Sequence, residues 1–311
     1  MRSYTPPGIL FNRHLETIYP SLLRRVKLQP GERERITTPD DDFLDLDWYR
    51  QEARRCVIIS HGLEGNSTRS YILGMAKAFF QNGYDVLTWN YRGCGEEMNR
   101  QLRFYHSGAT DDLRTVVSHV QGRYKEIYLI GFSLGGNITL KYLGEGSVPE
   151  EIKKAVAISV PLNLHTSCLV ISQPSNWIYT QRFLRSLTKK VKAKPKLKDL
   201  LDLTKLGTIR NLMEFDDHFT GPLHGFRDAI DYYTQCSSIH FLAGISTPTL
   251  IVNAQNDPFL SPDCYPINIE KQNPNIIFES PAHGGHVGFS LFNKNGLYWS
   301  EMRALSFIGS F

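Results

Sequence analysis

One turn in the sequence, Gly131-Phe132-Ser133-Leu134-Gly135-Gly136, constrains most strongly how this chain can fold. The apolar run Ile127–Ile130 before it predicts a short buried strand, and Asn137–Tyr142 after it predicts the start of a helix. Glycine permits backbone conformations and close approaches that a Cβ atom would block, and glycines stand on both sides of Ser133. The pattern therefore predicts a tight strand-to-helix turn with Ser133 at its tip.

Gly-x-Ser-x-Gly between a strand and a helix is the pattern of a nucleophile elbow. Such a turn lifts the Ser133 hydroxyl clear of the carboxyl end of the strand. It also leaves the Leu134 N–H at a helix N-terminus, whose partial positive charge favours an anion. A glycine-rich turn used only for helix–strand packing is the alternative interpretation, and the flanking elements favour the elbow.

A serine nucleophile needs a base, and the base needs an acid that orients it. In this architecture the acid precedes the base, and both lie on loops after later strands. The apolar run Thr249–Ala254 ends three residues before Asp257, and a further apolar run is followed by His283 and His286. The three residue types therefore occur in the expected order.

Both partners have competitors in the sequence. Asp257 precedes Pro258 and is compatible with an ordinary turn, and Asp263 is a second candidate acid, although Ser261-Pro262-Asp263 is more typical of a helix entry. Glycines 284 and 285 would let the loop bend towards the serine. Their position favours His286 as the base and leaves His283 as the alternative.

A tetrahedral intermediate also needs a second oxyanion donor, which an early loop supplies in this kind of fold. His61-Gly62-Leu63-Glu64-Gly65 follows the predicted strand Val57–Ser60. Gly62 would let the Leu63 N–H turn inward, so Leu63 and Leu134 are the predicted donors. We interpret His61 as a structural residue that closes the turn.

Short apolar runs alternate with helix-like stretches along most of the chain, which predicts a mainly parallel sheet covered on both faces. Arg33–Arg50 predicts an antiparallel hairpin at one edge, its second strand half exposed. The predicted strands are Cys56–Ser60, Asp85–Asn90, Ile127–Gly131, Ala155–Val160, Thr249–Ala254 and Ile276–Ser280, and the predicted helices are Ser70–Asn82, Thr110–Gln121, Asn137–Leu143 and Asp263–Lys271.

No strand pattern occurs between Val160 and Thr249, where Asn176–Thr188 and Gly225–Gln235 are helix-like. An interval this long has structure of its own or a function. We interpret residues 161–235 as a helical cap or lid inserted into a single domain spanning residues 1–311. The basic run 189–198 is a candidate for nucleic acid or an anionic membrane, but it contains no aromatic residue for base stacking. We expect a solvated loop or helix face there.

Composition excludes several classes of protein. The 311 residues are 41% hydrophobic and 21% charged, with a net charge of +4. Five scattered cysteines without a Cys-x-x-Cys favour a reducing compartment over a disulfide framework or zinc site. No secretory signal and no run of 18 apolar residues is evident, so a cytoplasmic location is expected, with peripheral membrane contact left open. Nothing suggests a metal or an organic cofactor, or a nucleic-acid partner.

Several longer segments resemble the YheT-like, embryogenesis-associated branch of the α/β-hydrolase superfamily, in the same order from about Pro7 to about Phe307. The resemblance implies an α/β-hydrolase fold and a triad of Ser133, Asp257 and His286, which decides the choice between the histidines. Asn66 stands where members often have serine. The segments are "HGLEGNSTRSYI", "NYRGCG", "YHSGATDDL", "GFSLGGNITLKYLGE", "FDDHFTGPLHGF" and "HGGHVGF".

Another segment typical of this branch, Met213–Tyr233, contains Asp216, Asp217 and His224. We expect its aromatic residues to anchor the helical insertion, and we do not expect direct catalytic roles for these three polar residues. Aromatic and aliphatic side chains here are candidates to line an acyl pocket. Residues 90–93, Asn-Tyr-Arg-Gly, follow a strand and are compatible with a turn or with a place near the site.

The function predicted from these residues is a serine hydrolase that cleaves carboxylic esters through an acyl-enzyme intermediate. The resemblance implies a carboxylesterase or lipid-ester hydrolase, with a small-molecule or lipid ester as substrate. An acyltransferase or thioesterase with the same triad is the nearest alternative, because the triad residues do not separate these outcomes. A non-catalytic binding protein on the hydrolase fold is the alternative from a different class. The sequence carries no signal for an oligomeric state.

Overall fold

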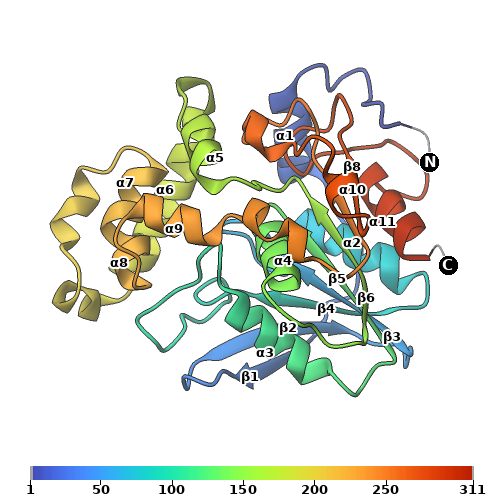
Figure 1. The fold of residues 1–311 in the computed structure, drawn as a ribbon, viewed down its shortest axis with the longest axis horizontal. Helices are drawn as coiled ribbons and strands as arrows, with labels where there is room; N and C mark the ends of the chain where they lie inside the picture. Colours follow the sequence, from blue (N-terminus) through green and yellow to red (C-terminus); the bar gives the residue numbers. More distant parts are fainter. Residues whose placement is uncertain (1–2, 310–311) are drawn as a thin grey trace.

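The computed structural model describes residues 3–309 and contains one eight-stranded sheet in the order β1-β2-β4-β3-β5-β6-β7-β8 (Figure 1). Strands β3 to β8 pair in parallel, as the alternation of apolar runs and helices predicted. The strands are β1 (Glu32–Thr37), β2 (Phe43–Tyr49), β3 (Arg55–Ser60), β4 (Asp85–Asn90), β5 (Glu126–Phe132), β6 (Ile152–Ile158), β7 (Thr249–Val252) and β8 (Ile276–Glu279).

The hairpin β1–β2 lies at one edge of the sheet, and β2 joins β4 in antiparallel register, as predicted. The prediction that β2 is half exposed was wrong, because Asp45 and Asp47 are buried. Arginines of β1 cover these carboxylates, and Arg35 Nε donates to Asp45 Oδ1 over 2.7 Å. Charge pairing therefore replaces the solvent on that face.

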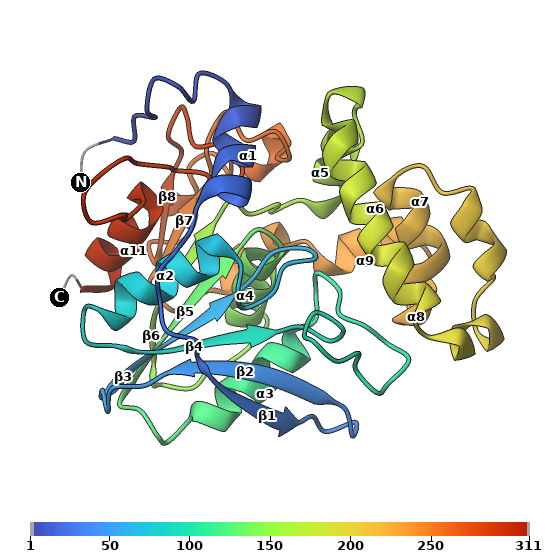
Figure 2. The same ribbon diagram turned by 180° about the vertical axis from the view of Figure 1, so that it is seen from behind.

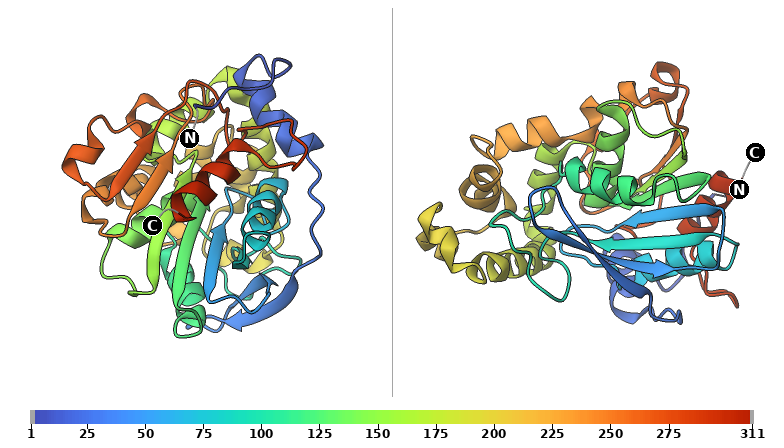
Figure 3. Two further views of the ribbon diagram at one scale, coloured as in Figure 1. Left: turned by 90° about the vertical axis from the view of Figure 1, so that its right-hand side faces the viewer. Right: turned by 90° about the horizontal axis from the view of Figure 1, so that it is seen from below.

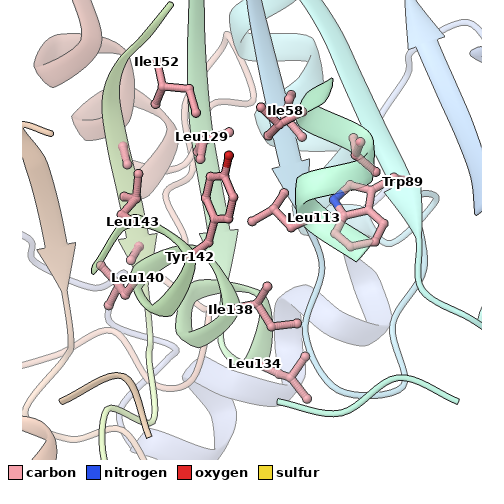
Figure 4. Packing of buried hydrophobic residues seen from close by; sticks show 14 of the residues in the cluster. Ile58, Trp89, Leu113, Leu129, Leu134, Ile138, Leu140, Tyr142, Leu143 and Ile152 are labelled. Atoms are coloured by element: carbon pink, nitrogen blue, oxygen red, sulfur yellow. The ribbon is translucent and has the colours of Figure 1, made fainter. Parts of the chain in front are cut away.

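Helices cover both faces of the sheet (Figure 3). On one face α3 (Thr110–Val120) and α4 (Leu134–Gly144) pack against the central strands, where Ile138 and Leu113 meet Ile58 and Leu129 (Figure 4). On the other face lie α2 (Ser70–Phe80) and α11 (Trp299–Gly309). Burial on both sides explains why the central strands are apolar at nearly every position.

The chain between β6 and β7 forms a group of helices beyond one end of the sheet (Figures 1 and 2). These helices share an apolar cluster that includes Leu184, Phe215 and Phe219, and loop residues such as Phe104 pack against it. The segments are α5 (Leu164–Ile171), 3-10 turn η1 (Pro174–Asn176), α6 (Trp177–Lys192), 3-10 turns η2 (Pro195–Asp199) and η3 (Leu203–Gly207), α7 (Leu212–Phe215), π-helix η4 (Asp216–Thr220), α8 (Gly221–Leu223), α9 (Ala229–Cys236), and 3-10 turns η5 (Ser238–His240) and η6 (Leu242–Gly244).

The remaining helices are α1 (Arg13–Leu23), a short 3-10 turn η7 (Pro262–Cys264) and α10 (Ile269–Gln272). A continuous helix over Asp263–Lys271 was therefore a wrong prediction. Pro266 lacks the N–H that a helix needs, and Asn268 has a left-handed φ of 60°. Within residues 3–309, no helix is long and apolar enough to cross a membrane.

The basic run 189–198 is only partly the solvated face that was predicted. Lys189, Lys192, Lys196 and Lys198 are exposed, but Lys194 is buried and its ammonium donates to Asn99 Oδ1 over 2.8 Å. Lys190 Nζ lies 2.6 Å from Glu64 Oε1. The run is therefore also an attachment of the helical segment to the sheet domain.

Arg92 forms a buried charge cluster that fixes the loop after β4. Its side chain is 1% exposed and its guanidinium donates to Asp112 (2.8 Å), Asp42 (3.0 Å) and Asp40 (2.9 Å). Burial raises the pKa of Asp112, and Arg92 counteracts that rise. The interpretation of residues 90–93 as a structural turn is thus the one that the contacts support.

We expect Arg92→Met to lower the free energy of unfolding by ~3–5 kcal/mol, because it leaves buried carboxylates without their counter-charge. Denaturant unfolding measures the difference. Arg100→Met is the control, since Arg100 pairs at 3.7 Å with an exposed Asp41, and its effect should be too small to resolve. An equal loss of unfolding free energy in both variants would contradict the stabilising role given to the Arg92 charge cluster.

Candidate active site

Ser133 stands at a strained turn between β5 and α4. Its φ of 52° and ψ of −120° are outside the regions that L-residues normally occupy. The glycines around it leave no room for side chains, since a Cβ on Gly131 would lie 2.3 Å from the Gly135 carbonyl oxygen and one on Gly135 would lie 2.4 Å from that of His61. The helix begins at Leu134, three residues earlier than predicted, directly after the serine.

The structure brings Ser133, His286 and Asp257 into one hydrogen-bonded row. His286 Nε2 lies 3.0 Å from Ser133 Oγ, and His286 Nδ1 lies 2.8 Å from Asp257 Oδ2 and 3.1 Å from Oδ1. These contacts require an Nδ1–H that donates to the carboxylate and a free Nε2 that accepts from the hydroxyl. A hydroxyl, an imidazole and a carboxylate are thus in the order that proton transfer from a serine would need.

Asp257 is held rigidly behind the histidine. Its side chain has no exposed surface, and its Oδ1 also accepts from the Phe259 N–H over 2.9 Å. The Phe259 ring packs against the imidazole with centroids 4.3 Å apart. The carboxylate and the aromatic ring therefore leave the imidazole of His286 little freedom to rotate.

The two competitors lie elsewhere. His283 is half exposed and its Nδ1 is 3.4 Å from Glu16 Oε1, on the outer side of the loop. Asp263 is exposed in η7. Neither is hydrogen-bonded to Ser133 or His286.

Four consecutive amides of the histidine loop are each held by a side chain from another part of the chain. The loop has φ values of 150° at Gly284, 57° at Gly285 and 58° at Val287, so its amides cannot pair within regular structure. The acceptors are Glu16 Oε2 for Gly284 (2.5 Å), Asn256 Oδ1 for Gly285 (3.0 Å), Thr17 Oγ1 for His286 (2.9 Å) and Ser159 Oγ for Val287 (2.9 Å).

Sequence reasoning missed these four positioning residues. Glu16 and Thr17 belong to α1, some 270 residues before the loop, and Glu16 is 1% exposed. The residues around Glu16 form no pattern that would predict its burial. The only available signal was the resemblance to the YheT-like branch, which begins at about Pro7 and so includes this helix.

Leu63 and Leu134 lie beside Ser133. Both residues line the same cavity as Ser133, and a Cβ on Gly62 would lie 3.1 Å from Ser133 Cβ, so the loop runs directly beside the serine. Across residues 3–309 neither amide has a protein acceptor. Two free N–H donors next to a hydroxyl are compatible with an oxyanion hole.

Glu64 fixes the loop that carries Leu63. Its φ is 53°, and the Gly65 N–H donates to the Gly62 carbonyl over 3.0 Å across the turn. The Glu64 carboxylate accepts from Tyr105 Oη (2.7 Å), from Lys190 Nζ (2.6 Å) and from Ser186 Oγ. Because Ser186 and Lys190 belong to α6, this network joins the helical segment to the loop beside the serine.

Two cavities meet at Ser133 and His286. The first lies under the helical segment and is mostly apolar, lined in part by Leu164, Leu187 and Leu212. The second lies between α1, the start of α2 and α6. No three His, Cys, Asp or Glu side chains in the described part of the chain are grouped to hold a metal ion.

The polar residues of the segment Met213–Tyr233 have structural partners, as expected. Asp217 Oδ1 accepts from the Ala229 N–H over 2.7 Å, and the His224 ring lies between two backbone carbonyls. Asp216 differs because it also lines the first cavity. Tyr233 Oη donates to it over 2.6 Å, and burial raises its pKa to about 6.

A family model described as the alpha/beta hydrolase fold matches residues 55–291, and the chain belongs to this family. Its relatives place it in the YheT-like branch of that family. It is 36% identical over 290 residues to "Putative esterase YheT" of Escherichia coli, covering 89% of this chain and 84% of that protein.

Two further relatives are lipases by name. The chain is 31% identical to a "Monoacylglycerol lipase" of Saccharomyces cerevisiae, over 84% of this chain and 60% of that protein. It is 30% identical to "Phospholipase ABHD3" of Homo sapiens, over 82% of this chain and 66% of that protein. A solved Pyrococcus furiosus esterase, Pf2001, has the same fold, with a TM-score of 0.62 at 17% identity over 99% of this chain and 97% of that one.

His61 is a buried structural residue of the loop beside the serine. It is wholly buried, with Nδ1 2.7 Å from the Gly62 carbonyl oxygen and Nε2 3.3 Å from the Tyr91 N–H. Burial, with the nearby charges of Lys190 and Arg69, lowers its pKa from 6.5 to about 3. Both ring nitrogens are thus occupied, and the neutral ring is the folded form.

This burial gives a testable pH dependence. The unfolded chain protonates His61 below pH 6.5 and the folded chain only near pH 3. Stability is therefore lost as pH falls between these values, at ~1.4 kcal/mol per pH unit. We expect the free energy of unfolding, measured with denaturant at pH 6, 5 and 4, to fall less steeply with decreasing pH for His61→Gln than for the wild type. The difference in slope should correspond to about one proton. The exposed His240 supplies the control, since His240→Gln should keep the wild-type slope.

Proposed function

We propose that the chain is a serine esterase that hydrolyses carboxylic esters through an acyl-enzyme. The observation that carries this proposal is the single imidazole of His286, which contacts Ser133 Oγ at 3.0 Å and Asp257 Oδ2 at 2.8 Å. Ser133 Oγ attacks the ester carbonyl carbon while His286 Nε2 accepts its proton. Asp257 keeps Nδ1 protonated and stabilises the imidazolium that forms.

The tetrahedral intermediate places negative charge on the former carbonyl oxygen. The N–H groups of Leu63 and Leu134 stabilise that oxygen, and both are without a protein acceptor within residues 3–309. The intermediate collapses as His286 donates its proton to the departing alkoxide. A water molecule then gives its proton to His286 and attacks the acyl carbon, which returns the Ser133 hydroxyl and releases the acid.

The first cavity supports an apolar acyl group as the other half of the substrate. Its walls next to Ser133 are formed by leucine, isoleucine and phenylalanine side chains, which bind hydrocarbon by excluding water. The names of the relatives, an esterase, a monoacylglycerol lipase and a phospholipase, agree with this substrate class. Carboxylic esters with a hydrocarbon acyl chain are therefore the proposed substrates.

A fluorophosphonate probe tests the nucleophile, because it labels only an activated serine. We expect wild-type protein to be labelled at Ser133, with peptide mapping by mass spectrometry, and Ser133→Ala to remain unlabelled. Unlabelled wild-type protein with a cooperative unfolding transition would refute the proposal and favour a non-catalytic binding protein.

We expect Asp257→Asn to lower kcat for p-nitrophenyl butyrate by ~10³–10⁴-fold with the fold retained, because the imidazole loses the partner that fixes its tautomer. The matched control is Asp263→Asn, which changes an exposed carboxylate on the same loop and should keep the wild-type kcat. A near-normal rate for Asp257→Asn would mean that Asp257 does not orient the base.

A further inference from the structure

The second cavity differs from the first in its charge. It contains Arg69 and Arg182 in its wall, together with Ser133 and His286. Arg69 immediately precedes α2, and Arg182 belongs to α6. Cationic side chains from two separate elements therefore face the cavity that adjoins the nucleophile.

Neither arginine has a carboxylate partner among residues 3–309. Arg69 Nη2 donates only to the Glu64 backbone carbonyl, over 3.2 Å, and Arg182 has no hydrogen bond or ion pair. The Glu64 side chain also borders the cavity, but its carboxylate is 6% exposed and already accepts from Lys190 and Tyr105. Arg182 is exposed and Arg69 is half-buried. Arg24, by contrast, is paired with Glu301 at 2.6 Å.

The two charges also repel each other. Partial burial and the neighbouring charge of Arg69 lower the pKa of Arg182. The first residues of α2, Ser70 and Tyr71, border the same cavity, so the positive end of that helix dipole lies there too. An anion in this cavity would relieve the repulsion and accept charge-assisted hydrogen bonds.

Apolar side chains border the same cavity. Leu22 of α1 and Ile178 of α6 are 72% and 67% exposed. Exposed leucine and isoleucine beside two guanidinium groups that lack carboxylate partners match a ligand with an anionic group and an apolar part. A small, wholly polar ester would leave these side chains in water.

We propose that Arg69 and Arg182 form a subsite for an anionic group, a phosphate or a carboxylate, on the alcohol portion of the ester substrate. This inference rests on the proposed esterase function. The apolar first cavity takes the acyl chain, and the second cavity takes the departing alcohol. Arg182 and Arg69 are then specificity-determining residues, since they act on the substrate and not on the reacting atoms.

Binding can be measured without catalysis. Calorimetry on the Ser133→Ala protein should detect glycerol 3-phosphate, and Arg182→Gln in that background should weaken its binding about 10-fold or more. The matched control is Arg185→Gln, since Arg185 is exposed on the same helix and borders neither cavity. Equal affinities in the Arg182 and Arg185 variants, or no binding by the parent, would overturn the subsite.

Turnover separates the sources of the anion. The experiment compares wild-type kcat/KM for three esters: 1-butyrylglycerol 3-phosphate, the butyryl ester of glycerate and neutral 1-butyrylglycerol. A preference of at least about 10-fold for the phosphate ester, the carboxylate ester or both supports the subsite. Arg182→Gln should remove this preference, whereas Arg185→Gln should keep it. Equal rates for the three esters would contradict it.

The two proposals fail in different ways. If fluorophosphonate labelling of Ser133 is absent but glycerol 3-phosphate still binds in an Arg182-dependent manner, the esterase function falls and the anion site stands. If labelling is normal and the charged and neutral esters react equally, the esterase function stands and the anion subsite falls.

Discussion

The structure depends on one strained residue, because the φ of 52° at Ser133 is what separates its hydroxyl from the sheet. A backbone in this region costs on the order of 1–3 kcal/mol and persists only where its surroundings fix it. Glycines at 131 and 135 let α4 pack against β5 and the His61 loop at distances that exclude any Cβ. The Ser133 N–H is also fixed, by the Ile158 carbonyl at 2.9 Å. Close packing thus holds the hydroxyl and the Leu134 amide in place before any ligand binds.

The imidazole of His286 is held in a different way, by a set of hydrogen bonds from other segments to its irregular loop. The side chains of Glu16 and Thr17 in α1 accept hydrogen bonds from the N–H groups of Gly284 and His286 respectively. A buried carboxylate is favourable only when its oxygens are satisfied, and Glu16 also accepts from Asn256 over 2.8 Å. The N-terminal helix is therefore part of the site's framework, although no side chain of α1 is hydrogen-bonded to Ser133.

Local pattern predicted those parts of the structure that local physics determines. Apolar runs, bounded in places by glycine, predicted the strands before Ser133 and Asp257 and the edge hairpin. Contacts between separate segments were invisible to that reasoning. A hydrogen bond to Asn99 helps to bury Lys194 in a run predicted to be solvated. Arginines of β1 pair with Asp45 and Asp47, which are buried in a strand predicted to be half exposed. The side chains that hold the amides of the histidine loop were missed for the same reason, since two of the four, Glu16 and Thr17, lie some 270 residues before the loop.

The two cavities suggest an order of events for the proposed reaction. An acyl chain in the apolar cavity stays in place while Ser133 carries the acyl group, because leaving would return its hydrocarbon to water. A charged alcohol on the arginine side is well hydrated once free, so it leaves after the first step. Its departure opens the space beside His286 from which water must attack. The cavity that recognises the leaving group would then also admit the second nucleophile, and the same open route would admit a larger acceptor if the acyl group were transferred.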